Sequence, residues 1–195
     1  MAFDLTGRVA IVTGNSTGLG KGIGHALGLA GARVAVNYQH QTERAQATLE
    51  EYRAAGIDSV LAQADVTTEK GVNQLFETVE SSLGQVDILI PNATCEQPQL
   101  PLEEYDWEFY QRMIDFFLKS PYLLARRALP TMKQKQHGRI VNIVSEVFHR
   151  SVPEFSAYVS AKGAQIGWTR SMATELAPYG ITVNMVAPGW IPVER

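Results

Sequence analysis

The sequence predicts an α/β fold, a Rossmann-like, doubly wound parallel sheet in a single domain. Three observations predict it. Short apolar, β-branched runs recur along the 195 residues, segments of helical length separate these runs, and glycines stand where the helical segments end. The runs are almost continuously apolar rather than alternating, which is typical of strands covered by helices on both faces. Because strand and helix alternate throughout, a parallel sheet is favoured.

We take the elements in order along the chain. The runs expected to be strands are residues 8–13, 33–38, 59–66, 86–91, 138–145 and 181–187. The segments expected to be helices are residues 18–31, 42–55, 69–83, 103–133 and 156–179. Glycine is expected to stop a helix at Gly31, Gly56, Gly84 and Gly180, and Pro130 is expected near a helix end. No linker, repeat or low-complexity tract interrupts the chain, so we predict one dinucleotide-binding oxidoreductase domain over 1–195.

Composition excludes several classes of protein. The net charge of −3 gives no basic patch of the kind that binds nucleic acid. No apolar run approaches the roughly 20 residues that span a bilayer, and the four histidines show no metal-ligand spacing. The single cysteine, Cys95, excludes an internal disulfide and fits a reducing cytosol. We therefore expect a cytoplasmic protein without metal, membrane or nucleic-acid partners.

A glycine-rich loop follows the first expected strand and opens the first expected helix. Gly14, Gly18 and Gly20 have the spacing G-x-x-x-G-x-G. Glycine permits a positive φ and a close approach of backbone to ligand, and the N–H groups of the following helix then face an anionic pyrophosphate. A tight turn without a ligand is the alternative, but the position between strand and helix favours a phosphate site. Gly22, Gly24 and Gly28 continue into the helix, which we expect to pack closely on the sheet.

Tyr158, Lys162 and Ser145 are the candidate catalytic residues. Tyr158 and Lys162 are four residues apart, so they share one face of a helix. An ammonium beside a phenol favours the phenolate and is expected to lower the tyrosine pKa. Such a pair alone is more often a solvated helix face. Ser145 changes this balance, because it ends a strand at the carboxyl edge of the sheet, where open α/β proteins bind ligands.

Six short motifs together resemble the classical short-chain dehydrogenase/reductase family. They are "TGNSTGLG" (13–20), "ADV" (64–66), "NA" (92–93), Ser145, "YVSAK" (158–162) and "PG" (188–189). The segments "VAVNYQ" and "PGWIPVER" are most similar to the 3-oxoacyl reductase and glucose dehydrogenase branches. The resemblance implies an NAD(P)-dependent oxidoreductase that transfers hydride between a nicotinamide cofactor and a small carbonyl or alcohol substrate. It also implies a homotetramer paired through 103–133 and 156–179.

The resemblance implies a role for each site residue. Tyr158 is the general acid/base, Lys162 also holds the nicotinamide ribose, and the Ser145 hydroxyl binds the substrate oxygen as charge develops there. The implied cofactor-binding residues are Gly14, Ser16, Thr17, Gly18, Leu19, Gly20, Tyr38, Asp65, Val66, Asn92, Ala93, Tyr158, Lys162, Pro188 and Gly189. Tyr38 stands where NAD-specific members carry an acidic residue, which favours NADP while leaving NAD possible.

The chain also departs from the family pattern. Phe117 occupies the place of an asparagine that holds a proton-relay water, and Asp115 is expected to point to another helix face. "PNAT" (91–94) replaces N-N-A-G, and the family continues for about fifty residues beyond "PGWIPVER", with a lid and a last strand. We expect the sequence to be part of a longer protein. These departures keep an alternative open, a non-catalytic dinucleotide-binding or sensing protein; a purely structural Rossmann domain fits so many ordered motifs poorly.

Overall fold

The apolar runs form one parallel sheet in the computed structural model, which describes residues 3–192. The strand order is β3-β2-β1-β4-β5-β6, so the chain starts in the middle and winds outward in both directions. In the register, Ile11 of β1 lies opposite Ala35 of β2 and Leu89 of β4. The strands are β1 (Val9–Val12), β2 (Arg33–Tyr38), β3 (Ser59–Gln63), β4 (Ile88–Ile90), β5 (Gly138–Ile143) and β6 (Ile181–Val186).

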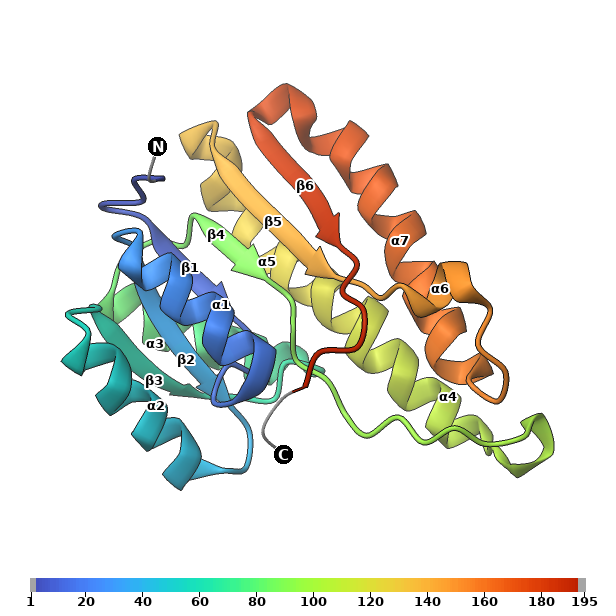
Figure 1. The fold of residues 1–195 in the computed structure, drawn as a ribbon. Helices are drawn as coiled ribbons and strands as arrows, with labels where there is room; N and C mark the ends of the chain where they lie inside the picture. Colours follow the sequence, from blue (N-terminus) through green and yellow to red (C-terminus); the bar gives the residue numbers. More distant parts are fainter. Residues whose placement is uncertain (1–2, 193–195) are drawn as a thin grey trace.

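Helices cover both faces of the sheet, as the continuously apolar strands predict (Figure 1). On one face lie α1 (Gly18–Leu29) and α2 (Thr42–Ala54), and on the other lie α3 (Glu69–Ser82), α5 (Ser120–Lys135) and α7 (Ser156–Leu176). The shorter elements are η1 (Leu102–Glu104), α4 (Trp107–Ile114), the π-helical turn η2 (Asp115–Lys119), α6 (Val147–Arg150) and η3 (Ala177–Tyr179).

The sheet separates two apolar layers, and alternate side chains of the central strand β1 enter one layer or the other. Val9 and Ile11 point into the layer shared with α3, α5 and α7, while Ala10 and Val12 point into the layer shared with α1 and α2. All four side chains are fully buried, which explains why the run is apolar without alternation. The predicted fold class is therefore confirmed.

Helix ends agree with the glycine prediction, and one predicted helix is wrong. Gly31, Gly56, Gly84 and Gly180 all have a positive φ. The segment 103–133, expected to be a single helix, is divided into η1, α4, η2 and α5. Asp106 accepts a hydrogen bond from the Phe109 N–H at 2.7 Å and so begins a new helix inside the predicted one.

One further expectation is corrected, and one is made more specific. Pro130 lies inside α5, which continues to Lys135, because the buried neighbours Ala128 and Met132 hold the helix on both sides of the lost N–H. The helix α1 packs on β1 and β2 as expected, but the nearest neighbours of two of its glycines lie elsewhere. A Cβ at Gly24 would collide with the Tyr52 hydroxyl and one at Gly28 with Ile57, so this helix approaches α2 and the loop after it, whereas Gly22 faces open space.

Residues 193–195, the end of "PGWIPVER", lie outside the described residues. Within 3–192, none of the helices combines the length and the apolar character needed to cross a membrane. The same residues contain no group of three His, Cys, Asp or Glu side chains placed to hold a metal ion.

Candidate active site

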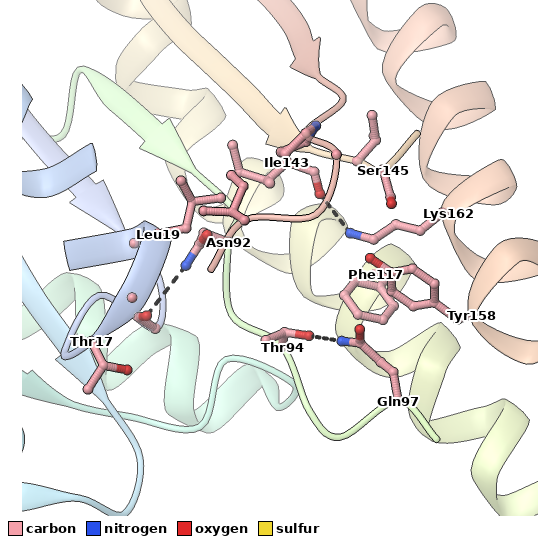
Figure 2. Close-up of a pocket in the computed structure, with 17 residues that line it drawn as sticks. Thr17, Leu19, Asn92, Thr94, Gln97, Phe117, Ile143, Ser145, Tyr158 and Lys162 are labelled. Carbon is pink, nitrogen blue, oxygen red and sulfur yellow. Dashed lines mark hydrogen bonds between the residues drawn. The ribbon is translucent and has the colours of Figure 1, made fainter. Parts of the chain in front are cut away.

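Two adjoining cavities lie at the carboxyl ends of the strands. The first, of about 330 Å³, runs from the glycine loop before α1 to the side chains of Ser145, Tyr158 and Lys162 (Figure 2). The second, of about 270 Å³, lies at the end of β2 and shares Gly14, Thr17 and Thr94 with the first. Together they make one path along the edge where a parallel sheet binds its ligand.

Every predicted site residue lines one or both cavities. The first is lined by Gly14, Thr17, Gly18, Leu19, Gly20, Asn92, Ser145, Tyr158, Lys162, Pro188 and Gly189. The second is lined by Gly14, Ser16, Thr17, Tyr38, Asp65, Val66 and Ala93. Residues far apart in the sequence are thus brought to one continuous surface.

The glycine loop has the shape of a phosphate cradle. Gly14 and Gly18 have φ values of 63° and 58°, which favour glycine. A Cβ on Gly14 would lie 2.9 Å from Cα of Ala93, and one on Gly20 would collide with the Asn92 amide. The loop therefore leaves the backbone bare beside the start of α1, and a dinucleotide pyrophosphate fits there.

Buried polar side chains that the sequence analysis did not single out hold this loop. Asn37 Oδ1 accepts from the Gly14 N–H at 3.1 Å, and Asn15 Oδ1 accepts from the Asn37 N–H at 2.7 Å. Thr13 Oγ1 accepts from the N–H groups of both Asn92 and Ala93 at 2.9 Å. The signal that could have found Asn37 is its polar side chain within the otherwise apolar run of β2, one residue before the strand ends.

The second cavity has the character of a site for the adenosine end of a dinucleotide. Tyr38 ends β2 and is buried, and His40 lines the same space. Asp65 Oδ1 accepts from the backbone N–H of Thr67 at 2.9 Å and from its hydroxyl at 2.6 Å, which fixes the turn after β3. No arginine or lysine of residues 3–192 lines this cavity, and its only carboxylate belongs to Asp65.

Tyr158 is surrounded by aromatic rings. Its ring lies 4.8 Å from that of Phe155 and 5.2 Å, edge to face, from that of Phe117. Burial raises the pKa of Tyr158, which outweighs the lowering effect of a hydrogen bond with Ser145. We expected Lys162 to lower this pKa; the pKa is raised instead, because desolvation of the phenolate is the larger effect.

Lys162 is the most deeply buried ionisable group of the site, with 3% of the residue exposed. Its Nζ donates to the Ile143 carbonyl oxygen at 2.6 Å and to Gln165 Oε1 at 3.1 Å. It also lies 3.9 Å from the centre of the Phe117 ring and 5.6 Å from that of Tyr158. Burial lowers the pKa of Lys162 to about 7, with a smaller opposing effect from Cys95.

Phe117 and Asp115 lie as the sequence predicted. Phe117, on η2, fills the place of the expected asparagine and is 3% exposed. Asp115 points elsewhere, accepting from Gln111 Nε2 at 3.1 Å and pairing with Lys119 at 3.6 Å. Figure 2 shows the Phe117 ring beside Lys162 and Tyr158. An apolar ring therefore contacts Lys162 at the position where we expected the amide of an asparagine.

Gln97 is a cavity residue that the sequence analysis missed. Its Nε2 donates to the Thr94 hydroxyl and, at 2.9 Å, to the Cys95 carbonyl oxygen, which holds the segment after β4 together where it lines the first cavity (Figure 2). Thr94, which replaces the last glycine of N-N-A-G, is thus the anchor of this segment. No spacing in the sequence signals the contact.

Comparison with known proteins agrees with this geometry. The family model described as short chain dehydrogenase matches residues 8–194. The chain belongs to the short-chain dehydrogenase/reductase family. This short-chain dehydrogenase is 39% identical over 186 residues to a 3-oxoacyl-acyl-carrier-protein reductase of Staphylococcus aureus, a match that covers 94% of this chain and 74% of that protein.

Solved structures show the same fold. A putative gluconate dehydrogenase from Agrobacterium tumefaciens has a TM-score of 0.91 and 37% identity, covering 97% of this chain and 74% of that one. A metagenomic short-chain oxidoreductase in complex with NADP has a TM-score of 0.89 and 33% identity, covering 95% and 84%. The short-chain dehydrogenase described here is therefore an enzyme of a family of NAD(P)-dependent oxidoreductases.

Proposed function

We propose that this short-chain dehydrogenase interconverts a small carbonyl compound and its alcohol, with Tyr158 as the general acid/base. One observation carries the proposal. Ser145, Tyr158 and Lys162 converge at one end of a cavity whose other end is the glycine loop. A dinucleotide held by that loop reaches the three side chains along a single edge of the sheet.

The residues divide the chemistry among them. A bound nicotinamide dinucleotide supplies the hydride in reduction and accepts it in oxidation. In reduction, Tyr158 gives its proton to the carbonyl oxygen, and Ser145 Oγ donates a hydrogen bond to that oxygen as its charge grows. The Lys162 ammonium stabilises the phenolate that remains. Phe117 and Phe155 cover the phenol ring and keep water from it.

The raised pKa of Tyr158 suits the reductive direction. A phenol whose pKa is raised by burial remains protonated at neutral pH, so it is ready to donate. The oxidative direction needs the phenolate and is expected to gain as pH rises. We therefore propose ketone reduction as the faster direction near pH 7.

NADP is the proposed cofactor. Tyr38 ends β2, so the cavity there presents no acidic side chain from that strand to repel a 2′-phosphate. His40 is the basic side chain lining it. The similar metagenomic oxidoreductase in complex with NADP also supports this choice.

A non-catalytic dinucleotide-binding protein is the second candidate, and Phe117 is the observation that favours it. The ring occupies the position at which a water-binding amide was expected, and Lys162 lies against it. Ser145 and Tyr158 weigh against this candidate, because a protein that only binds a dinucleotide needs no hydroxyl pair at the reacting end.

The substrate is proposed only by class. Similar proteins include a 3-oxoacyl-acyl-carrier-protein reductase and a putative gluconate dehydrogenase, so acyl and sugar-derived carbonyls are both candidates. Gln97 and Thr94 are among the polar side chains that line the first cavity. These side chains favour a substrate with a hydroxyl group beside the carbonyl.

The test is a cofactor-oxidation screen of the full-length protein. NADPH and NADH are each mixed with a panel of ketones, keto-acyl thioesters and keto-sugars, and oxidation is followed by absorbance. We expect turnover of at least one carbonyl class, with NADPH at least tenfold better than NADH in kcat/KM, a difference of about 1.4 kcal/mol. Binding of cofactor with no turnover across the panel would favour the non-catalytic candidate.

A further inference from the structure

The buried ammonium of Lys162 lies against the Phe117 ring, at the position where the family resemblance implied an asparagine. An ammonium carries three hydrogens and no acceptor. The Ile143 carbonyl takes one hydrogen at 2.6 Å, and the Phe117 ring, 3.9 Å away, offers only its π face. Burying an ammonium without hydrogen-bond acceptors costs free energy. Any further acceptor close to Lys162 Nζ therefore helps to fix its position.

Gln165 supplies the missing side-chain acceptor. It lies one turn further along α7, is 1% exposed, and its Oε1 is 3.1 Å from Lys162 Nζ. Since an ammonium only donates, the amide must present its oxygen to Lys162. We infer that Gln165 is a positioning residue for Lys162, providing the polar contact that the side chain at position 117 does not offer.

Hydrogen bonds from buried side chains also hold the helix backbone at Gln165. The Thr169 hydroxyl donates to the Gln165 backbone carbonyl at 2.7 Å, and Asn142 Nδ2 of β5 donates to that hydroxyl at 2.9 Å. Thr169 and Asn142 are both buried. These bonds join β5 to the backbone of α7 and do not involve Gln165 Oε1, in a helix that otherwise packs on the apolar layer of the core.

The contacts leave one hydrogen of Lys162 uncommitted. With Ile143 and Gln165 holding two, the third remains for the cofactor ribose or the phenol, the roles proposed for Lys162. This inference rests on the proposed function for its consequence in catalysis. The contact between Gln165 and Lys162 is measured without it.

Few titratable groups face Lys162 among the described residues. Tyr158 lies on its own helix and Cys95 in the segment after β4. From η2 it meets the uncharged Phe117 ring, and Asp115 is turned toward Gln111 and Lys119. From β5 it meets only the Ile143 carbonyl. A substitution at position 165 is therefore expected to change the titration of Lys162 more than that of any other group.

The test is an NMR pH titration of the full chain labelled with ¹³C-lysine. The sequence has six lysines, and Lys162→Met identifies the Lys162 signal. Gln165→Leu removes the acceptor, so the midpoint of Lys162 falls by about one pH unit or more. Gln165→Glu places a carboxylate beside the ammonium, so the midpoint rises by about one pH unit or more.

Thr169→Val is the matched control. It removes a buried hydrogen bond of the same helix but leaves Gln165 Oε1 in place, so it is expected to lower the melting temperature and leave the Lys162 midpoint within about 0.3 pH unit. Opposite shifts of the Lys162 midpoint in the two Gln165 variants support the inference. If Gln165→Leu does not fold, a higher Lys162 midpoint in Gln165→Glu supports it alone. Unchanged midpoints, shifts in the same direction, or an equal shift with Thr169→Val would overturn it. Because no turnover is needed, a failed carbonyl screen leaves this result readable.

Discussion

Lys162 and Tyr158 acquire their chemistry from burial more than from each other. Burial disfavours the charged form of each group, so it lowers the pKa of Lys162 and raises that of Tyr158. Both effects favour the uncharged form of the side chain. We expect a cofactor phosphate and ribose to reverse part of this, since they bring negative charge and hydroxyl acceptors to Lys162.

At position 117 we predict that Phe117→Asn raises the turnover number. An amide there can hold a water next to Lys162, while Gln165 already positions the ammonium, so the gain is about two- to fivefold, small beside a full general acid–base contribution. Loss of a buried ring also lowers the free energy of unfolding by about 2–4 kcal/mol. Steady-state kinetics and urea denaturation measure both. Phe117→Leu is the control: it loses the ring but gains no amide, and an equal increase in that variant would contradict the explanation.

A second residue-level prediction concerns stability and pH. The pKa of Lys162 is about 7 in the folded protein and about 10.5 as the ordinary value, so between these pH values the unfolded chain binds the extra proton. Stability contributed at this site therefore rises with pH across that window. Lys162→Met removes the buried amine and should be more stable than wild type by at least about 1 kcal/mol at pH 7. Urea denaturation should show that the difference in free energy of unfolding between Lys162→Met and wild type is smaller at pH 9.5 than at pH 7. A larger difference at pH 9.5 would contradict the conclusion that burial lowers the pKa of Lys162.

Single elements show where sequence reasoning succeeds and where it fails. The strands and the glycine stops were predictable because each depends on a local pattern, continuous apolar residues or a positive φ. The division of 103–133 was not, because the apolar pattern continues across the break, and neither the Asp106 cap nor the π-helical turn interrupts that pattern. Gln165 was missed for a similar reason, since a glutamine on a helix usually faces solvent and only the fold buries it.

The loop between β1 and α1 yields the clearest element-level prediction. Gly14→Ala should weaken NADPH binding at least tenfold and destabilise the fold by about 1–2 kcal/mol, because alanine disfavours φ near 63° and its Cβ would lie 2.9 Å from Cα of Ala93. Calorimetric titration and thermal denaturation measure the two effects. Gly22→Ala is the matched control within the same glycine-rich segment. It faces open space in α1, so it should stabilise the protein by about 0.4–1 kcal/mol and leave NADPH affinity unchanged. Equal loss of NADPH affinity in both variants would contradict the proposal that the loop at Gly14 binds the cofactor pyrophosphate.

At the scale of the whole molecule, the strand order explains the site. The chain begins at β1, winds to β3, then returns to β4, so the glycine loop and the segment after β4 meet beside the central strand. The motifs at 13–20, 64–66, 92–93, 145 and 158–162 all follow strands or begin helices at this one edge (Figure 1). Their order in the sequence predicted the motif residues that line the two cavities, while Asn37, Gln97 and Gln165, together with the distances and hydrogen bonds, required the structure.

We also propose that the protein forms a homo-oligomer, a tetramer, and that its single domain pairs through α5 and α7. An apolar groove of about 560 Å³ lies between these helices, lined by Leu129, Trp168 and Met172 with Tyr122 exposed at its side. Light scattering of the full-length protein at micromolar concentration should give a multiple of the monomer mass, most simply four. Met172→Glu should dissociate it, because the substitution replaces an apolar contact with a carboxylate that must lose its water when the groove is covered, even beside Arg126 and Lys133 at its rim. A monomer for the wild type would contradict this pairing.

The most direct test of the central claim, that Tyr158 transfers the proton, compares wild type with Tyr158→Phe. Both proteins are assayed for NADPH oxidation on one carbonyl that the wild type accepts, and NADPH binding is measured by calorimetry on the same samples. Because phenylalanine keeps the ring but has no proton to give, we predict that kcat falls by about 10²–10⁴-fold while the Kd for NADPH changes less than about threefold. Retention of wild-type turnover by Tyr158→Phe would contradict the account.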